Sequence, residues 1–145
     1  MIRKEDGRVR WMIEMDDVST RSDRHRLDRM AEIFVFEEAA LSGRPLGKNW
    51  VEAKRGALEL AMHNAGRNGL AMPSRQRPGV RHKSVAEFFE HFGSQARCFT
   101  NRSEAGLPGQ ESFTTWSTFT DSTFDIVAGL VEGERIGILC IDDED

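Results

Sequence analysis

The first clear pattern in the chain is an alternation of apolar and polar residues between positions 8 and 16. Val9, Trp11 and Ile13 recur at every second position, which is typical of a β-strand with one face in the core and one face in solvent. We therefore predict a strand here, with Arg10 on its wet face.

A helical spacing of apolar residues follows this strand. It begins after two N-cap candidates, Ser19 and Ser22, and continues to Gly43. The run Ile33–Phe36 inside it is apolar on every side, and we interpret it as part of the helix in preference to a short hidden strand.

Two further helices are indicated by spacings that resemble a capping box, in which a polar residue is followed three residues later by glutamate. The pairs are Asn49 with Glu52 and Ser84 with Glu87. Glycine C-caps at Gly66 and Gly93 are expected to end these helices.

Beyond Gly93 the apolar residues return to a period of two. The predicted strands cover residues 96–100, 113–119, 123–131 and 135–141. Both faces of the last strand are apolar, so we expect it to be central and covered on both sides.

The order strand, helices, strands predicts an α+β fold. We expect an antiparallel sheet of about four to five strands, formed by the N-terminal strand and the C-terminal meander, with two to three helices packed on one face. A length of 145 residues fits one domain spanning residues 1–145.

Composition narrows the class of protein. No stretch approaches the ~20 consecutive apolar residues of a membrane span, and the N-terminus lacks an apolar export segment. Cys98 and Cys140 both lie in apolar stretches and are expected to be reduced thiols. We therefore expect a cytoplasmic protein that does not enter the membrane and carries no cofactor.

The formal net charge of −4 conceals a separation of sign along the chain. Residues 60–86 hold five basic residues and no acid, whereas residues 111–145 hold nine acids and one arginine. Such an asymmetry bears on binding partners and not on the fold. The two segments could also neutralise each other within the molecule.

Known catalytic signatures are missing from the sequence, including phosphate-binding glycine loops, the serine-hydrolase elbow and zinc-binding spacings. One candidate metal site remains. Asp16 and Asp17 follow the first predicted strand, and Asp142 and Asp143 follow the last. If the two strand ends met, four carboxylates could bind Mg²⁺ and support a metal-dependent hydrolase.

The basic segment gives a second hypothesis, a nucleic-acid-binding module that uses the loop 67–83. Its candidate residues are Arg75, Arg77, Arg81, His82 and Lys83. Arginine suits phosphate because its planar group donates two hydrogen bonds. However, no aromatic residue between Trp50 and Phe88 offers a stacking platform, and the whole chain is acidic.

The acidic segment gives the leading hypothesis, a small non-enzymatic protein that binds another macromolecule, as an inhibitor or immunity-type protein does. Trp116 stands among hydroxyl residues and is a candidate contact anchor. The predicted partner-binding residues are Trp116, Asp121, Asp125, Glu132, Glu134, Asp142 and Asp143. A protein partner with a basic surface, possibly a nucleic-acid enzyme, would complement these carboxylates.

Overall fold

The computed structural model has an antiparallel six-stranded sheet with the strand order β1-β2-β8-β7-β6-β5, and it describes residues 1–16, 21–68, 79–102, 117–122 and 124–143. The strands are β1 (Ile2–Asp6), β2 (Val9–Met15), β5 (Val51–Ala53), β6 (Arg97–Thr100), β7 (Phe124–Glu132) and β8 (Arg135–Asp143). The helices are α1 (Asp23–Ile33), α2 (Arg55–Asn68) and α3 (Lys83–Glu90). A second, two-stranded sheet joins β3 (Val35–Phe36) to β4 (Leu41–Ser42), and short 3₁₀ turns η1 (Glu37–Ala39) and η2 (Gly47–Asn49) complete the elements. The predicted α+β class with an antiparallel sheet is confirmed.

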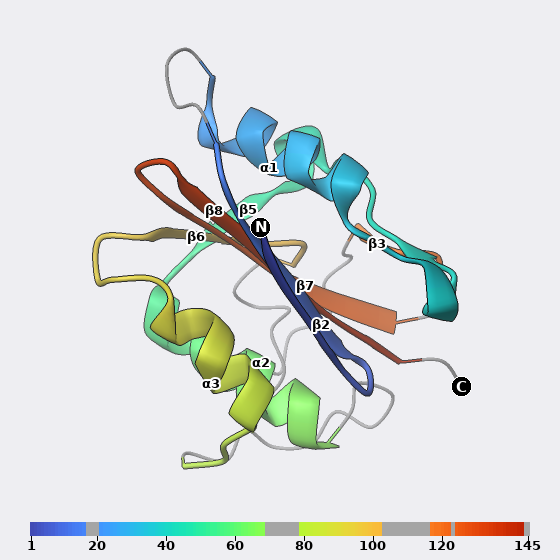
Figure 1. The fold of residues 1–145 in the computed structure, drawn as a ribbon. Coiled ribbons are helices and arrows are strands. Elements are labelled where there is room, and N and C mark those ends of the chain that lie inside the picture. The colour runs from blue at the N-terminus through green and yellow to red at the C-terminus, as the bar shows by residue number, and fades with distance from the viewer. Residues whose placement is uncertain (17–20, 69–78, 103–116, 123, 144–145) are drawn as a thin grey trace.

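The helices lie on both faces of the sheet, not on one as predicted (Figure 1). One core layer packs α2 and α3 against Trp11, Leu130 and Leu139, and the other packs α1 against Val127 and Ile138. Alternate residues of β7 and β8 point to opposite faces, and both sets are apolar. Two apolar faces each need a cover, so the helices divide between them.

β8 is central, as predicted, and pairs with β2 on one side and β7 on the other. The strand predictions at the first alternation, at 96–100 and at 123–131 are also confirmed within one or two residues. Of the predicted strand 113–119, residues 113–116 lie outside the described part of the chain, and residues 117–122 form no strand. β1 escaped prediction because four of its five residues are charged.

The first helix is shorter than predicted and ends at Ile33. Phe34 leaves the helical region, and its carbonyl accepts a hydrogen bond from the backbone N of Gly43 (2.8 Å). Phe34 and Phe36 are both buried on the α1 side, which is the two-residue period of a strand and not the period of a helix. Ser22 does cap the helix, as predicted, by accepting a hydrogen bond from the N–H of His25.

Both predicted capping boxes are wrong. The first lies at the start of β5, which pairs with β6, and α2 begins only at Arg55 and runs past Gly66. The second begins two residues late, because His82, and not Ser84, is the N-cap of α3. The Ser84 hydroxyl instead donates a hydrogen bond to Asp6 (2.7 Å). Strand pairing and tertiary contacts override the local signal at both places.

Cys98 and Cys140 are free, buried thiols that belong to core layers on opposite faces of the sheet, so they do not pair with each other. Burial raises the pKa of Cys98 to about 11 and raises that of Cys140 well above its ordinary value. Both thiols therefore behave as small core hydrophobes. Within the described residues, none of the helices is long and apolar enough to cross a membrane.

Candidate functional site

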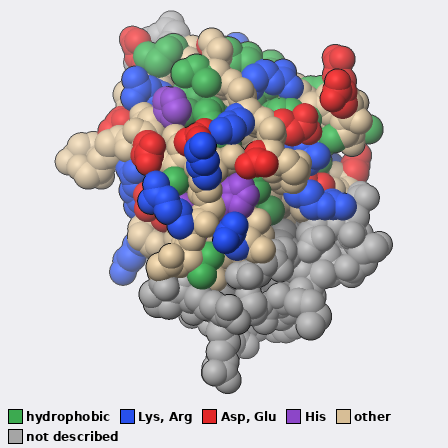
Figure 2. Space-filling view, turned by 60° about the horizontal axis from the view of Figure 1, so that its bottom comes forward, with side chains coloured by type: hydrophobic (Ala, Val, Ile, Leu, Met, Phe, Trp, Pro, Cys, Tyr) green, Lys and Arg blue, Asp and Glu red, His purple; other side chains and the backbone are tan. Residues whose placement is uncertain are grey.

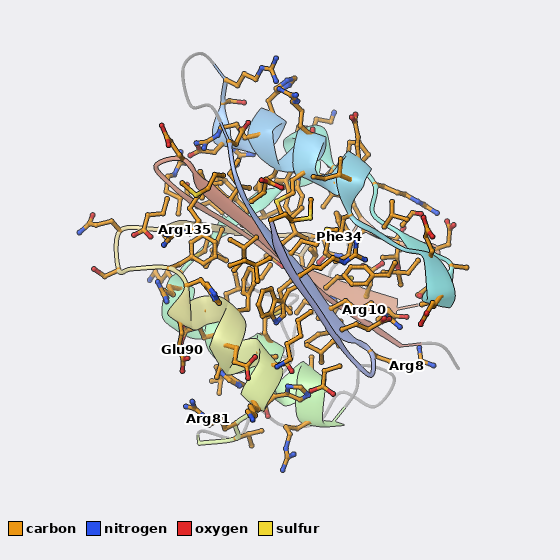
Figure 3. The ribbon with its side chains drawn as sticks, viewed as in Figure 1. Arg8, Arg10, Phe34, Arg81, Glu90 and Arg135 are labelled. Atoms are coloured by element: carbon orange, nitrogen blue, oxygen red, sulfur yellow. The ribbon has the colours of Figure 1, made fainter. Side chains whose placement is uncertain are left out.

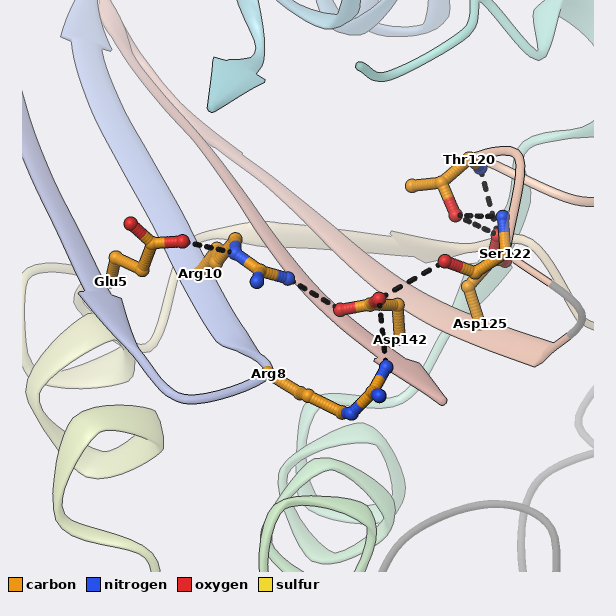
Figure 4. Close-up of polar contacts among 7 residues, drawn as sticks. All are labelled: Glu5, Arg8, Arg10, Thr120, Ser122, Asp125 and Asp142. Atoms are coloured by element: carbon orange, nitrogen blue, oxygen red, sulfur yellow. Dashed lines mark hydrogen bonds and ion pairs between the residues drawn. The ribbon is translucent and has the colours of Figure 1, made fainter. Parts of the chain in front are cut away.

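The most heavily charged part of the interior lies where β8 ends beside the start of β2 (Figure 4). Asp142 accepts hydrogen bonds from Arg10 Nη1 (2.5 Å), Arg8 Nη1 (3.3 Å) and Ser122 Oγ (3.0 Å). Arg10 also donates through Nε to Glu5 (2.6 Å). These five residues, Glu5, Arg8, Arg10, Ser122 and Asp142, are called the Asp142 network below.

Strand register explains why the network lies inside the molecule. Arg10 is in phase with Met12 on β2, and Asp142 is in phase with Cys140 on β8, so both point to the α1 side of the sheet. Asp142 is only 5% exposed, and Arg10 is buried beside it. The prediction that Arg10 lies on a wet face is therefore wrong, because α1 and the β3–β4 hairpin cover that face.

Asp125 lies on β7 directly across from Asp142 in the strand register and is completely buried. Its carboxylate accepts hydrogen bonds from Asn101 Nδ2 (2.7 Å), the backbone N atoms of Phe119 and Thr120 (3.0 and 2.8 Å), and the Thr120 hydroxyl (2.9 Å). Burial raises the pKa of Asp125, and the hydrogen bonds from Phe119 and Thr120 and the charge of Arg102 oppose that rise. Both carboxylate oxygens are thus committed to holding the segment 117–122 against the sheet.

A hollow of about 380 Å³ opens next to the Asp142 network. It is lined by Gly7, Arg8, Arg10, Ala39, Ala40, Leu41, Asp121, Ser122 and Asp142, and is called the Arg8 hollow below. The side chain of Arg8 is 50% exposed and that of Asp121 is 85% exposed, although Asp121 also forms an ion pair with Arg44. The hollow therefore presents one half-free guanidinium and one exposed carboxylate above a floor whose charges are already paired.

The predicted partner-binding acids do not form one surface. Asp125 and Asp142 are buried, and Asp121 is exposed at the Arg8 hollow. Glu132 and Glu134 lie at the opposite end of β8, which has nine residues and spans about 26 Å at roughly 3.3 Å per residue. Figure 3 shows the same separation through Arg8 and Arg135, which lie at opposite ends of the sheet. The side chains of Trp116 and Asp143 lie outside the described part of the chain.

The carboxylates proposed to bind a metal are also separated. Because β2 and β8 are antiparallel, Asp16 adjoins Glu134, to whose carbonyl its backbone N donates (2.7 Å), while Asp142 lies at the other end. The carboxylate of Asp16 pairs with Arg26 (3.2 Å), and Asp17 lies outside the described residues. Across the described ranges, no cluster of three or more metal-ligating side chains occurs.

Of the predicted nucleic-acid-binding residues, Arg75 and Arg77 lie outside the described part of the chain. Arg81 is exposed and pairs with Glu90 (3.4 Å), and Lys83 is exposed at the start of α3. Figure 2 brings this side of the molecule forward and shows basic and acidic side chains intermixed over its described part. The described residues therefore present no surface of a single positive sign here.

His82 contributes a packing contact between α2 and α3. Its backbone N donates a hydrogen bond to Nδ1 of His63 on α2 (2.9 Å), and its ring lies against Gly66. Burial lowers the pKa of His63; Glu59 opposes this shift, whereas the charges of Arg81 and His82 add to it. A protonated His63 could no longer accept this hydrogen bond.

This contact predicts a dependence of stability on pH. As pH falls below about 6.5, the ordinary value for histidine, the unfolded chain binds a proton at residue 63 before the folded chain does, so the free energy of unfolding decreases. The loss is complete once pH has passed below the lowered pKa of the folded state. Urea unfolding between about pH 7.5 and 5 measures it, and His63→Gln, which keeps an acceptor, should show a shallower dependence. Identical pH profiles for the two proteins would contradict this role.

Sequence patterns did not indicate five residues as parts of a site: Glu5, Arg8, Arg10, Ser122 and Asn101. Alternation within the strands could have revealed part of it, because Asp125 and Asp142 occupy positions in phase with buried apolar residues of β7 and β8. An acid in phase with a core face needs a partner, and Arg10 is in phase with Met12 in the same way. Comparison of the chain with protein-family models, with curated proteins and with solved structures gives no match.

Proposed function

We propose that this protein acts by binding another protein, in the manner of an inhibitor or immunity protein, and that the Arg8 hollow and its rim form the contact. The observation that carries the proposal is the buried Asp142 network beneath an open hollow. The proposed contact does not include the whole acidic segment 111–145, because Asp125 and Asp142 of that segment are buried.

Stability alone gives no reason to keep this network. Replacing a buried ion pair with apolar residues of similar volume is often neutral or stabilises a protein by about 1–4 kcal/mol. Asp125 and Asp142 also face each other across neighbouring strands, an arrangement of like charges that destabilises a sheet. Ala40, in the wall of the hollow, has a left-handed φ of +52°, which costs a residue with a Cβ about 1–2 kcal/mol. Features that lower stability in this way tend to cluster at functional sites.

The charges around the hollow suit a basic protein surface. Asp121 is an exposed carboxylate in the lining of the hollow. Glu37 and Glu38 are also exposed; they directly precede the lining residue Ala39 and line a second hollow together with Arg3 and Glu5. Arg8 would face a carboxylate of the partner, because its guanidinium has donors beyond its one bond to Asp142. A nucleic acid would meet the three carboxylates with its phosphates, so a polyanion fits this end less well. We place the encounter in the cytoplasm, where buried cysteines remain thiols.

The test begins with the immobilised protein and an extract of the source cells, from which retained proteins are identified by mass. The affinity of the purified pair is then measured at increasing salt concentrations. We expect the Kd to rise with salt, because charge complementarity contributes to the encounter. The double variant Glu37→Lys/Glu38→Lys should raise the Kd at least about tenfold.

Glu134→Lys is the matched control, since Glu134 is equally exposed but lies at the far end of the sheet. Its Kd should stay within about a factor of two of the unmodified protein, as expected for a charge change distant from the contact. A Kd that responds to Glu134→Lys and not to the changes at Glu37 and Glu38 would place the contact at the β7–β8 turn. The absence of any partner, or binding that is insensitive to salt, would count against the proposal.

A further inference from the structure

β1 is an edge strand of the six-stranded sheet, paired with β2 on one side only. It lies at the front of the view in Figure 1, between α1 above and α3 below. Four of its five residues are exposed and the fifth, Lys4, is half-buried. An edge of this kind presents unpaired backbone N–H and C=O groups to solvent.

The hairpin turn determines which backbone groups are unpaired. Residues 7 and 8 join β1 to β2, and Gly7 has the positive φ of +60° that a glycine supplies at the first central position of a type II′ turn. In a two-residue hairpin, Asp6 and Val9, which flank the turn, form a hydrogen-bonded pair. The ladder then alternates, so the backbone groups of Arg3 and Glu5 point to the free edge.

We propose that β1 pairs in antiparallel fashion with β1 of a second copy of this chain, around a twofold axis that passes through Lys4. In this register Arg3 of each copy lies opposite Glu5 of the other, and these are the two residues whose backbone groups are free. Each such pair forms backbone hydrogen bonds. It also places the Arg3 guanidinium, which donates to the Val35 carbonyl (2.8 Å), beside the Glu5 carboxylate, which accepts from Arg10 through Oε2 (2.6 Å). The two six-stranded sheets join into one continuous sheet.

Charge selects this register from its alternatives. Only registers that pair Arg3 or Glu5 with another outward-pointing residue can form the hydrogen bonds, and a twofold axis at either of these residues would place like charges opposite each other. An axis at Lys4 brings the two lysines together, but each already forms an ion pair with Glu87 of its own α3. Like-charge repulsion at the axis is thereby reduced.

Site-specific cross-linking tests the register directly. In Lys4→Cys, the two new thiols face each other across the axis at a non-hydrogen-bonded position, where Cβ atoms approach within disulfide range. We expect this variant to oxidise to a covalent dimer at micromolar concentration. Ile2→Cys is the control, since residue 2 lies opposite residue 6 of the other copy and its thiols remain apart. Cys98 and Cys140 are buried and do not interfere.

Sedimentation equilibrium tests the charges and the backbone. Arg3→Glu alone and Glu5→Arg alone should each raise the dimer Kd about tenfold, whereas a mixture of the two variants should restore an affinity close to that of the unmodified protein through a heterodimer. Arg3→Pro removes the outward backbone N–H and should abolish the dimer. Arg3→Ala keeps this N–H and should weaken the dimer less. Far-UV circular dichroism checks that each variant folds. If Glu5→Arg does not fold, the comparison of Arg3→Pro with Arg3→Ala still tests the pairing.

A monomer at every concentration, or a dimer that Arg3→Pro leaves intact and Lys4→Cys does not cross-link, would overturn this pairing. Equal cross-linking of Ile2→Cys and Lys4→Cys would overturn the register. These outcomes are distinguishable from a failure of the proposed function, because self-association is measured on the protein alone, and Ile2, Arg3 and Lys4 belong neither to the Asp142 network nor to the lining of the Arg8 hollow.

Discussion

Replacement of Arg10 by methionine should lower the free energy of unfolding by about 3–5 kcal/mol, the usual cost of leaving one partner of a buried ion pair alone. Arg10 supplies the shortest hydrogen bond to Asp142, and Asp142 is only 5% exposed, so water from the adjacent hollow replaces the lost guanidinium only in part. Arg8 remains, but its contact is longer, at 3.3 Å, and its side chain is half exposed. Urea unfolding followed by circular dichroism measures the change.

The double variant Arg10→Met/Asp142→Leu separates the cost of a broken pair from the worth of the intact pair. Both side chains then become apolar next to Met12, Cys140 and Leu41, and most of the lost stability should return. If the network is kept for binding, this stable double variant should still bind its partner more weakly than the unmodified protein. A double variant as unstable as Arg10→Met would show that the ion pair itself stabilises the fold.

The strands of the C-terminal half could be predicted because their residues repeat with a clear period and are bounded by turn residues. β7 and β8 carry apolar side chains on both faces, which correctly indicated a central position. The same pattern implied that both faces must be covered, and the arrangement of helices on one face conflicted with it. The spacing of apolar residues in a strand shows which of its faces are buried. The face of the sheet on which each helix packs depends on the connections between elements, which no local pattern encodes.

Elements with no repeating apolar pattern could not be predicted. β1 is almost wholly charged, and it forms because the turn at Gly7 folds it back onto β2. Val35 and Phe36 lie in an apolar run that suits either a helix or a strand, and pairing with β4 decides between them. In both cases the deciding interaction comes from another segment of the chain.

The distribution of charge along the sequence indicated an unusual region but predicted the wrong arrangement of its acidic residues. Counting acids along residues 111–145 treats them as one patch, whereas the β7–β8 hairpin sends Glu132 and Asp142 to opposite ends of the sheet. It also treats every acid as exposed, although the strand register buries Asp125 and Asp142. The arginines that neutralise Asp142 come from the N-terminal hairpin, more than 130 residues away in sequence.

Asp125 organises the segment that carries Asp121 and Ser122 to the Arg8 hollow. Its carboxylate accepts the backbone N–H groups of Phe119 and Thr120, and Thr120 Oγ1 in turn accepts a hydrogen bond from the backbone N of Ser122 (3.1 Å). Ser122 then donates to Asp142. The position of the exposed carboxylate at the rim therefore depends on a carboxylate that is completely buried.

Substitution of Asp125 by alanine should destabilise the protein by about 3–5 kcal/mol, because it leaves the buried donors of Asn101, Phe119 and Thr120 without their acceptor, each at a cost of roughly 1–3 kcal/mol before relaxation. Thr120→Val is the matched control, since it keeps the carboxylate and removes only the hydroxyl, which donates to Asp125 and accepts from the backbone N of Ser122, and it should cost about 1–2 kcal/mol. Denaturant unfolding of both variants measures the difference. Hydrogen exchange at the backbone N–H groups of Phe119 and Thr120 should accelerate strongly in Asp125→Ala and only slightly in Thr120→Val. Equal destabilisation by the two substitutions would mean that the hydroxyl, and not the carboxylate, holds the segment in place.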